Sequence, residues 1–215
     1  MNNCTVPSIN KMLIEQPPIP YRMLFPETVW RIPMKHKAVF LTFDDGPIPE
    51  VTPWVLDLLD HYGIKATFFC VGDNVRKHPE TFRMVVERGH SVGNHTMHHL
   101  QGAKVTTARY VADIMEAHAL IDSPLFRPPH GLIRWKQAAA IKDNMRIIMY
   151  DLVTRDYSKK LTGEQVLDNV RRYMRNGSII VFHDSLKSES NLRYALPRAI
   201  EWLKENGYQF LPIPM

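Results

Sequence analysis

The sequence predicts an α/β fold with a parallel sheet of about seven strands, enough to curl into a (β/α) barrel. From residue 37 onward, short apolar runs of strand length alternate with amphipathic segments of helix length. Proline and glycine mark the two ends of several amphipathic segments, as they do at helix termini. An open doubly wound sheet is the structural alternative, but no glycine-rich phosphate loop follows the first apolar run, so a nucleotide site is not expected.

The first 35 residues precede this alternation and contain six prolines. Such density disfavours a helix or a central strand and predicts an extended arm. Leu24, Phe25 and Trp30 are too apolar for a free tail, so we expect the arm, residues 1–35, to pack on a globular domain formed by residues 36–215. We expect Cys4 to lie in the tail of the arm.

The first half of the domain is expected to hold three strands, at residues 37–43, 65–71 and 90–94. Between them, residues 52–63 predict a helix with Thr52 as N-cap, Pro53 in the first turn and Gly63 just past the end. Residues 79–89 predict a second helix, which again begins with proline and ends at glycine.

The second half continues the same alternation. We expect helices at residues 107–121, 134–144, 163–177 (with Thr162 as its cap) and 191–207 (with a kink at Pro197). The intervening strands are expected at residues 125–129, 146–152 and 178–184, and residues 208–212 close the domain.

Composition and charge are ordinary for one soluble globular domain: 215 residues, 45% apolar, 23% charged, net charge +5. Arg171, Arg172 and Arg175 suggest a solvated helix face, so nucleic acid is not an expected partner. Two cysteines give no disulfide framework, and Cys70 is expected to be a buried thiol. We find no signal peptide and no membrane-length apolar run, which favours a cytoplasmic location unless a leader was removed. The oligomeric state is not predicted.

Ionisable residues recur where the predicted strands end. Two aspartates, Asp44 and Asp45, end the first strand, and His95, His98 and His99 follow the third. Three further positions continue the pattern at later strands: Arg127, Asp156, and His183 with its neighbour Asp184. Because the C-terminal ends of parallel strands meet on one face, we expect a site there.

His95 and His99 are four residues apart, so one helical turn would place both imidazoles on the same side. Two neutral imidazoles and one carboxylate form a familiar set for Zn, Fe, Mn or Co. One aspartate of the Asp44–Asp45 pair can bind the metal while its neighbour stays free as a base, and the cation offsets the repulsion between them. The alternative for the pair is an ordinary type I turn.

With these motifs in place, the chain resembles the polysaccharide deacetylases, carbohydrate esterase family 4, which includes the chitin and peptidoglycan deacetylases. The motifs that carry the resemblance occur in family order and approximate spacing: TFDDG (42–46), HTMHH (95–99), RPPHG (127–131), TRDY (154–157) and IIVFHD (179–184). It spans roughly residues 37–212. The resemblance implies a distorted (β/α) barrel of about seven strands, consistent with the strand count.

The resemblance also implies roles for individual residues. One divalent ion, zinc or otherwise Co, Mn, Fe or Ni, would be held by Asp45, His95 and His99. Asp44 would be the general base, oriented by Arg127.

Two further roles complete the implied site. His183 would be the general acid, oriented and charge-tuned by Asp156. The substrate side would comprise the backbone N–H of His130 as an oxyanion donor, the aromatic wall of Tyr157, and Ile179 with Val181 as the pair that receives the acetyl methyl group.

The chain departs from the family pattern at several positions. Leu100 replaces a common proline, His130 a usual aromatic, Tyr157 a usual tryptophan, and Val153 a frequent aspartate. These changes bear on substrate choice more than on chemistry. We expect His98 to face the pocket rim or solvent.

Other ionisable residues receive structural roles. Asp184 is expected to cap the loop after its strand without a catalytic role, and the remaining histidines to be surface or capping residues: His36, His61, His78, His90 and His118.

The expected function is metal-dependent hydrolysis of N-acetyl groups from a sugar or polysaccharide, with release of acetate. The partner implied is an N-acetylated carbohydrate. One alternative is a deacylase of a different scaffold, such as an O-acetyl ester or a small amide. The other is a carbohydrate-binding protein without catalytic activity. It is disfavoured because every implied catalytic position holds a side chain that can carry out the chemistry.

Overall fold

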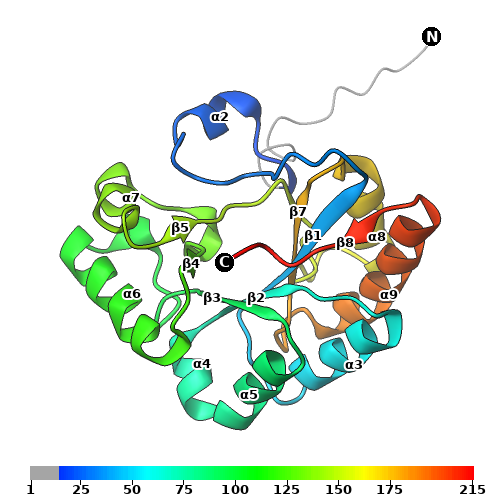
Figure 1. The fold of residues 1–215 in the computed structure, drawn as a ribbon, viewed down its shortest axis with the longest axis horizontal. Coiled ribbons are helices and arrows are strands. Elements are labelled where there is room, and N and C mark those ends of the chain that lie inside the picture. Colours follow the sequence, from blue (N-terminus) through cyan, green and yellow to red (C-terminus); the bar gives the residue numbers. More distant parts are fainter. Residues whose placement is uncertain (1–14) are drawn as a thin grey trace.

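A computed structural model describes residues 15–215. Its sheet is parallel throughout and curls around a central axis with helices outside it (Figure 1). The strands follow the order β5-β4-β3-β2-β1-β7-β6, and β8 pairs with the start of β1. Their bounds are β1 (Ala38–Asp44), β2 (Thr67–Cys70), β3 (Ser91–Asn94), β4 (Leu125–Phe126), β5 (Arg146–Ile147), β6 (Leu152–Val153), β7 (Ile179–His183) and β8 (Gln209–Phe210). The predicted distorted (β/α) barrel is confirmed.

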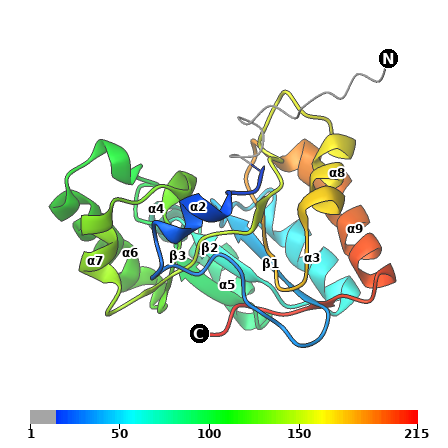
Figure 2. The ribbon, with the colours of Figure 1, turned by 90° about the horizontal axis from the view of Figure 1, so that it is seen from above.

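The helices form a partial ring around the sheet, and two short 3₁₀ turns lie in the connecting loops. Figure 2 shows this ring from above, with α6 and α7 on one side and α8 and α9 on the other. The bounds are α2 (Ile19–Met23), α3 (Thr52–Tyr62), α4 (Gly72–Lys77), α5 (Pro79–Glu87), η1 (Gly102–Lys104), α6 (Thr107–Ile121), η2 (Pro129–Gly131), α7 (Trp135–Ile141), α8 (Gly163–Tyr173) and α9 (Glu189–Glu205).

Most predicted elements are present, and the exceptions have local causes. Thr162 caps α8 in a capping box, and Gly63 ends α3 with φ 66°, as predicted. Thr52 is not an N-cap; it is the first residue of α3, and its hydroxyl donates to Asp184 at 2.6 Å. The single strand predicted over residues 146–152 is two short strands, β5 and β6, and α4 was not predicted.

Alternation along the central strands β1 and β7 separates an outer face from an inner face. Leu41 and Phe43 face outward into the largest apolar cluster, which packs under the helices. The inner face of β1 carries Phe40, then Thr42, then Asp44, so its polarity rises toward the C-terminal end of the strand. This gradient gives the barrel an apolar floor and a polar mouth.

The barrel floor is a buried cluster of side chains from the inner face together with the C-terminal tail. Ile213 of the tail is fully buried there, and its backbone N–H donates to Thr67 Oγ1 at 2.8 Å. Figure 1 shows the tail crossing the barrel at this end. The members of this floor are Phe40, Phe69, Leu125, Ile148, Ile179 and Ile213.

The N-terminal segment lies against the barrel from residue 15 onward, and residues 1–14, including Cys4, lie outside the described residues. It contains one short helix, α2, which the prediction of an extended arm missed; prolines precede this helix and occupy its first turn, where they are tolerated. Phe25 and Trp30 are buried in a cluster with α6 and α7. Val29 bridges to Ile148 at the sheet edge.

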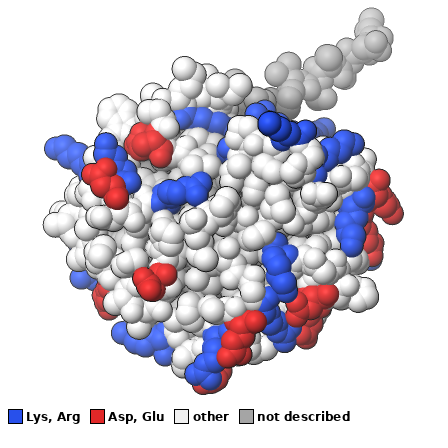
Figure 3. All heavy atoms as spheres, viewed as in Figure 1, with Lys and Arg blue, Asp and Glu red and all other residues white. Residues whose placement is uncertain are grey.

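Surface charge is mixed on the face shown in Figure 3, where both basic and acidic side chains occur around the rim. Cys70 is a buried free thiol, as predicted. Among residues 15–215, no helix is long and apolar enough to cross a membrane.

Asp151 joins the N-terminal segment to the barrel. Its carboxylate is fully buried and accepts hydrogen bonds from Arg22 (2.5 Å), Arg175 (2.7 Å) and Ser178 (2.6 Å). Burial alone would raise the pKa of Asp151, but these donors outweigh burial and lower it.

We expect Asp151→Asn to lower the free energy of unfolding by about 3 kcal/mol, because it leaves two guanidinium groups without their anion. Chemical denaturation at pH 7 would measure this loss. The stabilisation by Asp151 is present above its ordinary pKa near 3.8 and is lost as the pH falls through the lowered value. Asp168→Asn, at an exposed carboxylate beside Arg171, is the matched control, and an equal loss in both variants would contradict the prediction.

Candidate active site

The polar mouth of the barrel encloses a cavity of about 240 Å³. Strand-end side chains from β1, β7 and the loops after β3, β4 and β6 converge on it. The sequence-predicted residues that line it are Asp44, Asp45, His95, His99, Arg127, His130, Tyr157, Val181 and His183. Of the residues chosen from strand ends, Asp44, Asp45, His95, His99, Arg127 and His183 line the cavity, whereas His98, Asp156 and Asp184 do not; His130, Tyr157 and Val181 came from the family resemblance.

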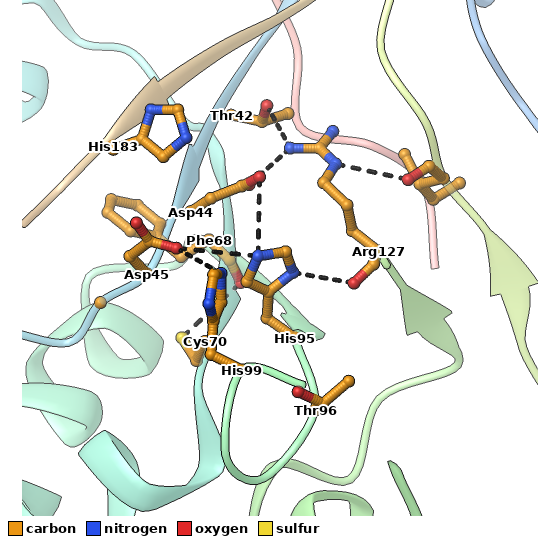
Figure 4. Close-up of polar contacts among 12 residues, drawn as sticks. Thr42, Asp44, Asp45, Phe68, Cys70, His95, Thr96, His99, Arg127 and His183 are labelled. Atoms are coloured by element: carbon orange, nitrogen blue, oxygen red, sulfur yellow. Dashed lines mark hydrogen bonds and ion pairs between the residues drawn. The ribbon is translucent and has the colours of Figure 1, made fainter. Parts of the chain in front are cut away.

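Asp45, His95 and His99 form a group whose ligand atoms all lie within 4.8 Å of one another. Figure 4 shows the carboxylate of Asp45 facing both imidazoles. Its Oδ1 lies 3.1 Å from His99 Nε2 and 3.7 Å from His95 Nε2. The Asp45 carboxyl is half-buried, yet its pKa lies well below the usual value because the hydrogen bond from His99 and the nearby imidazoles outweigh burial.

His95 is held in one tautomer by the backbone. Its Nδ1–H donates to the carbonyl oxygen of Arg127 at 2.8 Å, which leaves the lone pair of Nε2 facing Asp45. Burial lowers the pKa of His95 to about 4, so the imidazole is neutral at pH 7. A neutral imidazole with a free Nε2 is the form that binds a metal ion.

Asp44 forms a buried ion pair with Arg127. Arg127 Nη1 donates to Asp44 Oδ1 at 2.6 Å and to Thr42 Oγ1 at 2.8 Å. Figure 4 shows Arg127 reaching Asp44 and Thr42. The rest of the guanidinium donates to the carbonyls of Ile148 and Met149, so all of its nitrogens are held by hydrogen bonds. The guanidinium also lies 4.0 Å above the ring of Phe69, which belongs to the barrel floor.

His183 and Asp156 form a second hydrogen-bonded pair at the cavity, with His183 on β7 beside Asp44 of β1. Asp156 Oδ1 accepts from His183 Nδ1 at 2.7 Å, and its Oδ2 accepts from the backbone N–H of His183 at 2.8 Å. Burial alone would lower the pKa of His183, but Asp156, with help from Asp45 and Asp44, outweighs it and raises this pKa to about 9. His183 is therefore an imidazolium at neutral pH.

Left-handed backbone conformations gather around the cavity. Asp45 (φ 78°), Thr96 (φ 65°), His99 (φ 53°) and His130 (φ 61°) all adopt positive φ, which non-glycine residues rarely do. The loop between His95 and His99 is fixed by side-chain hydrogen bonds: Asn94 Oδ1 accepts from the N–H of Thr96 at 2.8 Å. Conformations of this kind persist at sites that the surrounding structure over-determines.

The walls of the cavity correct one prediction and include residues that were not predicted to lie there. Val181 lines the cavity, but Ile179, two residues earlier on the same inner face, lies one layer deeper in the barrel floor. Val153 of β6 pairs with Val181 and lines the wall instead. Tyr150 and Lys187 also line the cavity and were missed, because both lie in irregular segments without a strand-end signal.

Two other ionisable residues, His98 and Asp184, lie near the site but outside the cavity, whereas His90 lies at the opposite, N-terminal end of β3. His98 is partly exposed and bonds to Asp113, as discussed below. Asp184 is fully buried, and its carboxylate accepts from the N–H of Gly46 at 3.1 Å and from Thr52. His90 was expected to be a surface or capping residue. It is buried and not on the surface, and its Nδ1 accepts a hydrogen bond from the backbone N–H of Ala66.

Comparison with known proteins agrees with this geometry. The family model described as polysaccharide deacetylase matches residues 31–146. The chain belongs to the polysaccharide deacetylase family. It is thereby classed among the hydrolases that act on non-peptide carbon–nitrogen bonds.

Several members of the family are similar over most of the chain. A peptidoglycan-N-acetylglucosamine deacetylase of Bacillus cereus is 32% identical, covering 86% of this chain and 90% of its own. A chitooligosaccharide deacetylase of Bradyrhizobium sp. is 30% identical over 83% of this chain and 90% of its own. The crystal structure of the Bc1960 peptidoglycan N-acetylglucosamine deacetylase, in complex with 4-naphthalen-1-yl-N-oxidanyl-benzamide, superposes with a TM-score of 0.84 at 30% identity, covering 92% of this chain and 95% of that one.

Titration of His183 tests the charge arrangement directly. In metal-free protein, NMR should give His183 a pKa of about 9, and Asp156→Asn should lower it, because burial remains while the main anionic partner is lost. The His183–Asp156 interaction stabilises the fold fully below pH 6.5, and the stabilisation is lost as the pH rises through about 9. Asp143→Asn, at an exposed residue, is the control; an unchanged His183 titration in Asp156→Asn would contradict the assignment.

Proposed function

We propose that this protein hydrolyses the N-acetyl groups of an N-acetylglucosamine-containing glycan with the help of one divalent metal ion, releasing acetate and a free amino sugar. The observation that carries the proposal is the convergence of three separate devices on one cavity. These are the Asp45–His95–His99 group, the Asp44–Arg127 pair and the His183–Asp156 pair.

The residues present fit a divalent ion. Asp45 supplies an ionised carboxylate, and His95 supplies a neutral imidazole whose free nitrogen faces it. His99 completes a set of two imidazoles and one carboxylate, which suits zinc and other first-row ions and leaves coordination positions open. When bound, such an ion would lower the pKa of a water molecule and polarise the acetyl carbonyl.

Asp44 is placed to take a proton from water at the site. One of its oxygens is occupied by Arg127, and the other, Oδ2, faces His95 at 4.0 Å. Arg127, whose Nη1 also donates to Thr42, fixes the carboxylate through Oδ1 and leaves Oδ2 of Asp44 to act as the base. Asp44 cannot be both the base and a metal ligand, and its ion pair with Arg127 favours the role of base.

His183 is placed to protonate the departing amine. An amine is a poor leaving group unless it gains a proton as the carbon–nitrogen bond breaks. The raised pKa of His183, about 9, keeps a proton on its ring at neutral pH. Asp156 holds Nδ1, so the proton is delivered from Nε2.

The remaining walls suit an acetyl group and a sugar ring. Val181 and Val153 give an apolar surface for the methyl group. Tyr157 stands edge-on to His183, with ring centroids 4.9 Å apart, and offers an aromatic wall to the sugar. The backbone N–H of His130 is the proposed donor to the developing oxyanion, a contribution of about 3 kcal/mol at such sites.

A different acyl scaffold remains the second candidate, because the cavity rim differs from the usual family pattern at His130 and Tyr157. A panel of soluble acyl substrates would separate the two candidates. Activity confined to N-acetylglucosamine oligomers would eliminate the second.

Substitution of the two aspartates tests their division of labour. Asp44→Asn should lower kcat for acetate release by about 10²–10⁴-fold, because the base is lost, while metal binding measured by calorimetry is retained. Asp45→Ala should lose both activity and metal binding. Asp143→Asn is the matched control on the surface. Unchanged turnover in Asp44→Asn would overturn the assignment of the base.

Removal of the metal tests the proposal as a whole. Prolonged dialysis against a chelator should abolish acetate release from chitooligosaccharides or peptidoglycan fragments, and stoichiometric Zn²⁺ or Co²⁺ should restore it. A preparation that stays fully active without detectable metal, or one that no first-row ion activates, would contradict the proposed function.

A further inference from the structure

A second cavity lies beside the catalytic cavity and shares two residues with it. It has a volume of about 310 Å³, and Asp45 and His99 line both cavities. Its separate walls are Val71, Asp73 and Asn74 from the start of α4, together with His98. The two hollows are therefore contiguous across the metal-ligand group.

His98 is held in a fixed orientation at this second cavity. Asp113 of α6 has no exposed side-chain surface, and its Oδ1 accepts from His98 Nδ1 at 2.6 Å. Its Oδ2 accepts from the backbone N–H groups of Met97 and His98, at 2.9 Å and 3.0 Å. The arrangement repeats that of His183 on Asp156: a buried carboxylate binds Nδ1 and leaves Nε2 available.

Two polar side chains of this cavity, His98 and Asp73, can form hydrogen bonds beyond those they make within the protein. Within residues 15–215, no protein group bonds to Nε2 of His98, whose side chain is 40% exposed. Asp73 pairs with Arg76 and Lys77 on its solvent side, and a carboxylate retains further acceptor sites after two such contacts. Val71 adds an apolar surface between them.

A second cation is the competing occupant, because His98, Asp113 and Glu116 lie close enough to hold one. However, both oxygens of Asp113 already accept hydrogens from the loop that carries His98. A cation there would have to displace contacts that shape the loop between His95 and His99. Spaced acceptors and one apolar wall instead match the hydroxyls and C–H face of a sugar ring.

We propose that this second cavity, bounded by Asp73 and His98, binds a neighbouring pyranose unit of the glycan whose N-acetyl group occupies the catalytic cavity. The inference rests on the proposed function, since it assigns a place to the next unit of the same substrate. It makes His98 a residue that selects for chain length.

Kinetics on substrates of two lengths test the proposal. In the zinc-loaded wild-type enzyme, kcat/KM should be greater for the N-acetylglucosamine tetramer than for the monosaccharide. His98→Ala should lower the tetramer-to-monosaccharide ratio by about fivefold, mainly through KM, since one hydrogen bond is lost from the second cavity. Asp73→Leu, from a different element, should lower the same ratio and carries the test if His98→Ala fails to fold. His61→Ala, at an exposed histidine on α3, is the matched control.

Binding separates this inference from the proposed function. Tetramer affinity is measured by calorimetry in the Asp44→Asn background, and His98→Ala and Asp73→Leu should each weaken it by about fivefold. That result would support the second cavity even if no acetate were released. Ratios and affinities within twofold of the parent protein in both variants would overturn the proposal while leaving the proposed function standing.

Discussion

The negative charges of the two adjacent carboxylates at the end of β1 each need a partner of their own, and the arrangement of the site depends on this. Asp44 is paired with Arg127 at 2.6 Å, in the interior of the barrel mouth. Asp45 faces His99 at 3.1 Å and His95 beyond it. Because neither partner set can serve both carboxylates, the pair is divided into one group fixed from below and one group open to a cation.

The backbone makes this division possible. Simple strand alternation would send Asp45 to the outer face, opposite to Asp44. Instead the strand ends at Asp44, and Asp45 adopts φ 78°, so its side chain also reaches the cavity. Gly46 follows because a Cβ there would lie 2.1 Å from the Asp184 carboxylate, which accepts a hydrogen bond from the Gly46 N–H. The Asp-Asp-Gly order is thus a requirement of geometry as well as of chemistry.

Sequence reasoning located the site well because parallel strands end on one face, which fixes where Asp44, His95 and His183 lie without any knowledge of register. It failed at residues whose place depends on the depth of the cavity or on the course of an irregular loop. Ile179 shares the inner face with Val181, and only the depth of the cavity separates their surroundings. Tyr150 reaches the cavity from an irregular segment, and no local pattern specifies that path.

Thr52 shows a different limit. The sequence places it correctly at the start of a helix, but its hydroxyl is used by a residue 132 positions away, Asp184, instead of by the helix itself. Local propensity cannot detect such a competitor. The buried Asp184 also shows why local charge is hard to predict: burial, together with the charges of Asp45 and Asp44, raises its pKa to about 8.

The proposed acid and base depend on a different part of the structure from the proposed metal ligands. Asp44 and His183 are register partners on β1 and β7, which pair over five residues. A slip of one residue would turn one of them to the outer face, so extensive strand pairing protects their relation. His95 and His99 depend instead on a short loop held by side-chain and carbonyl contacts. Damage to that loop should therefore weaken metal binding first, while the strand register keeps the proposed acid and base side by side at the cavity.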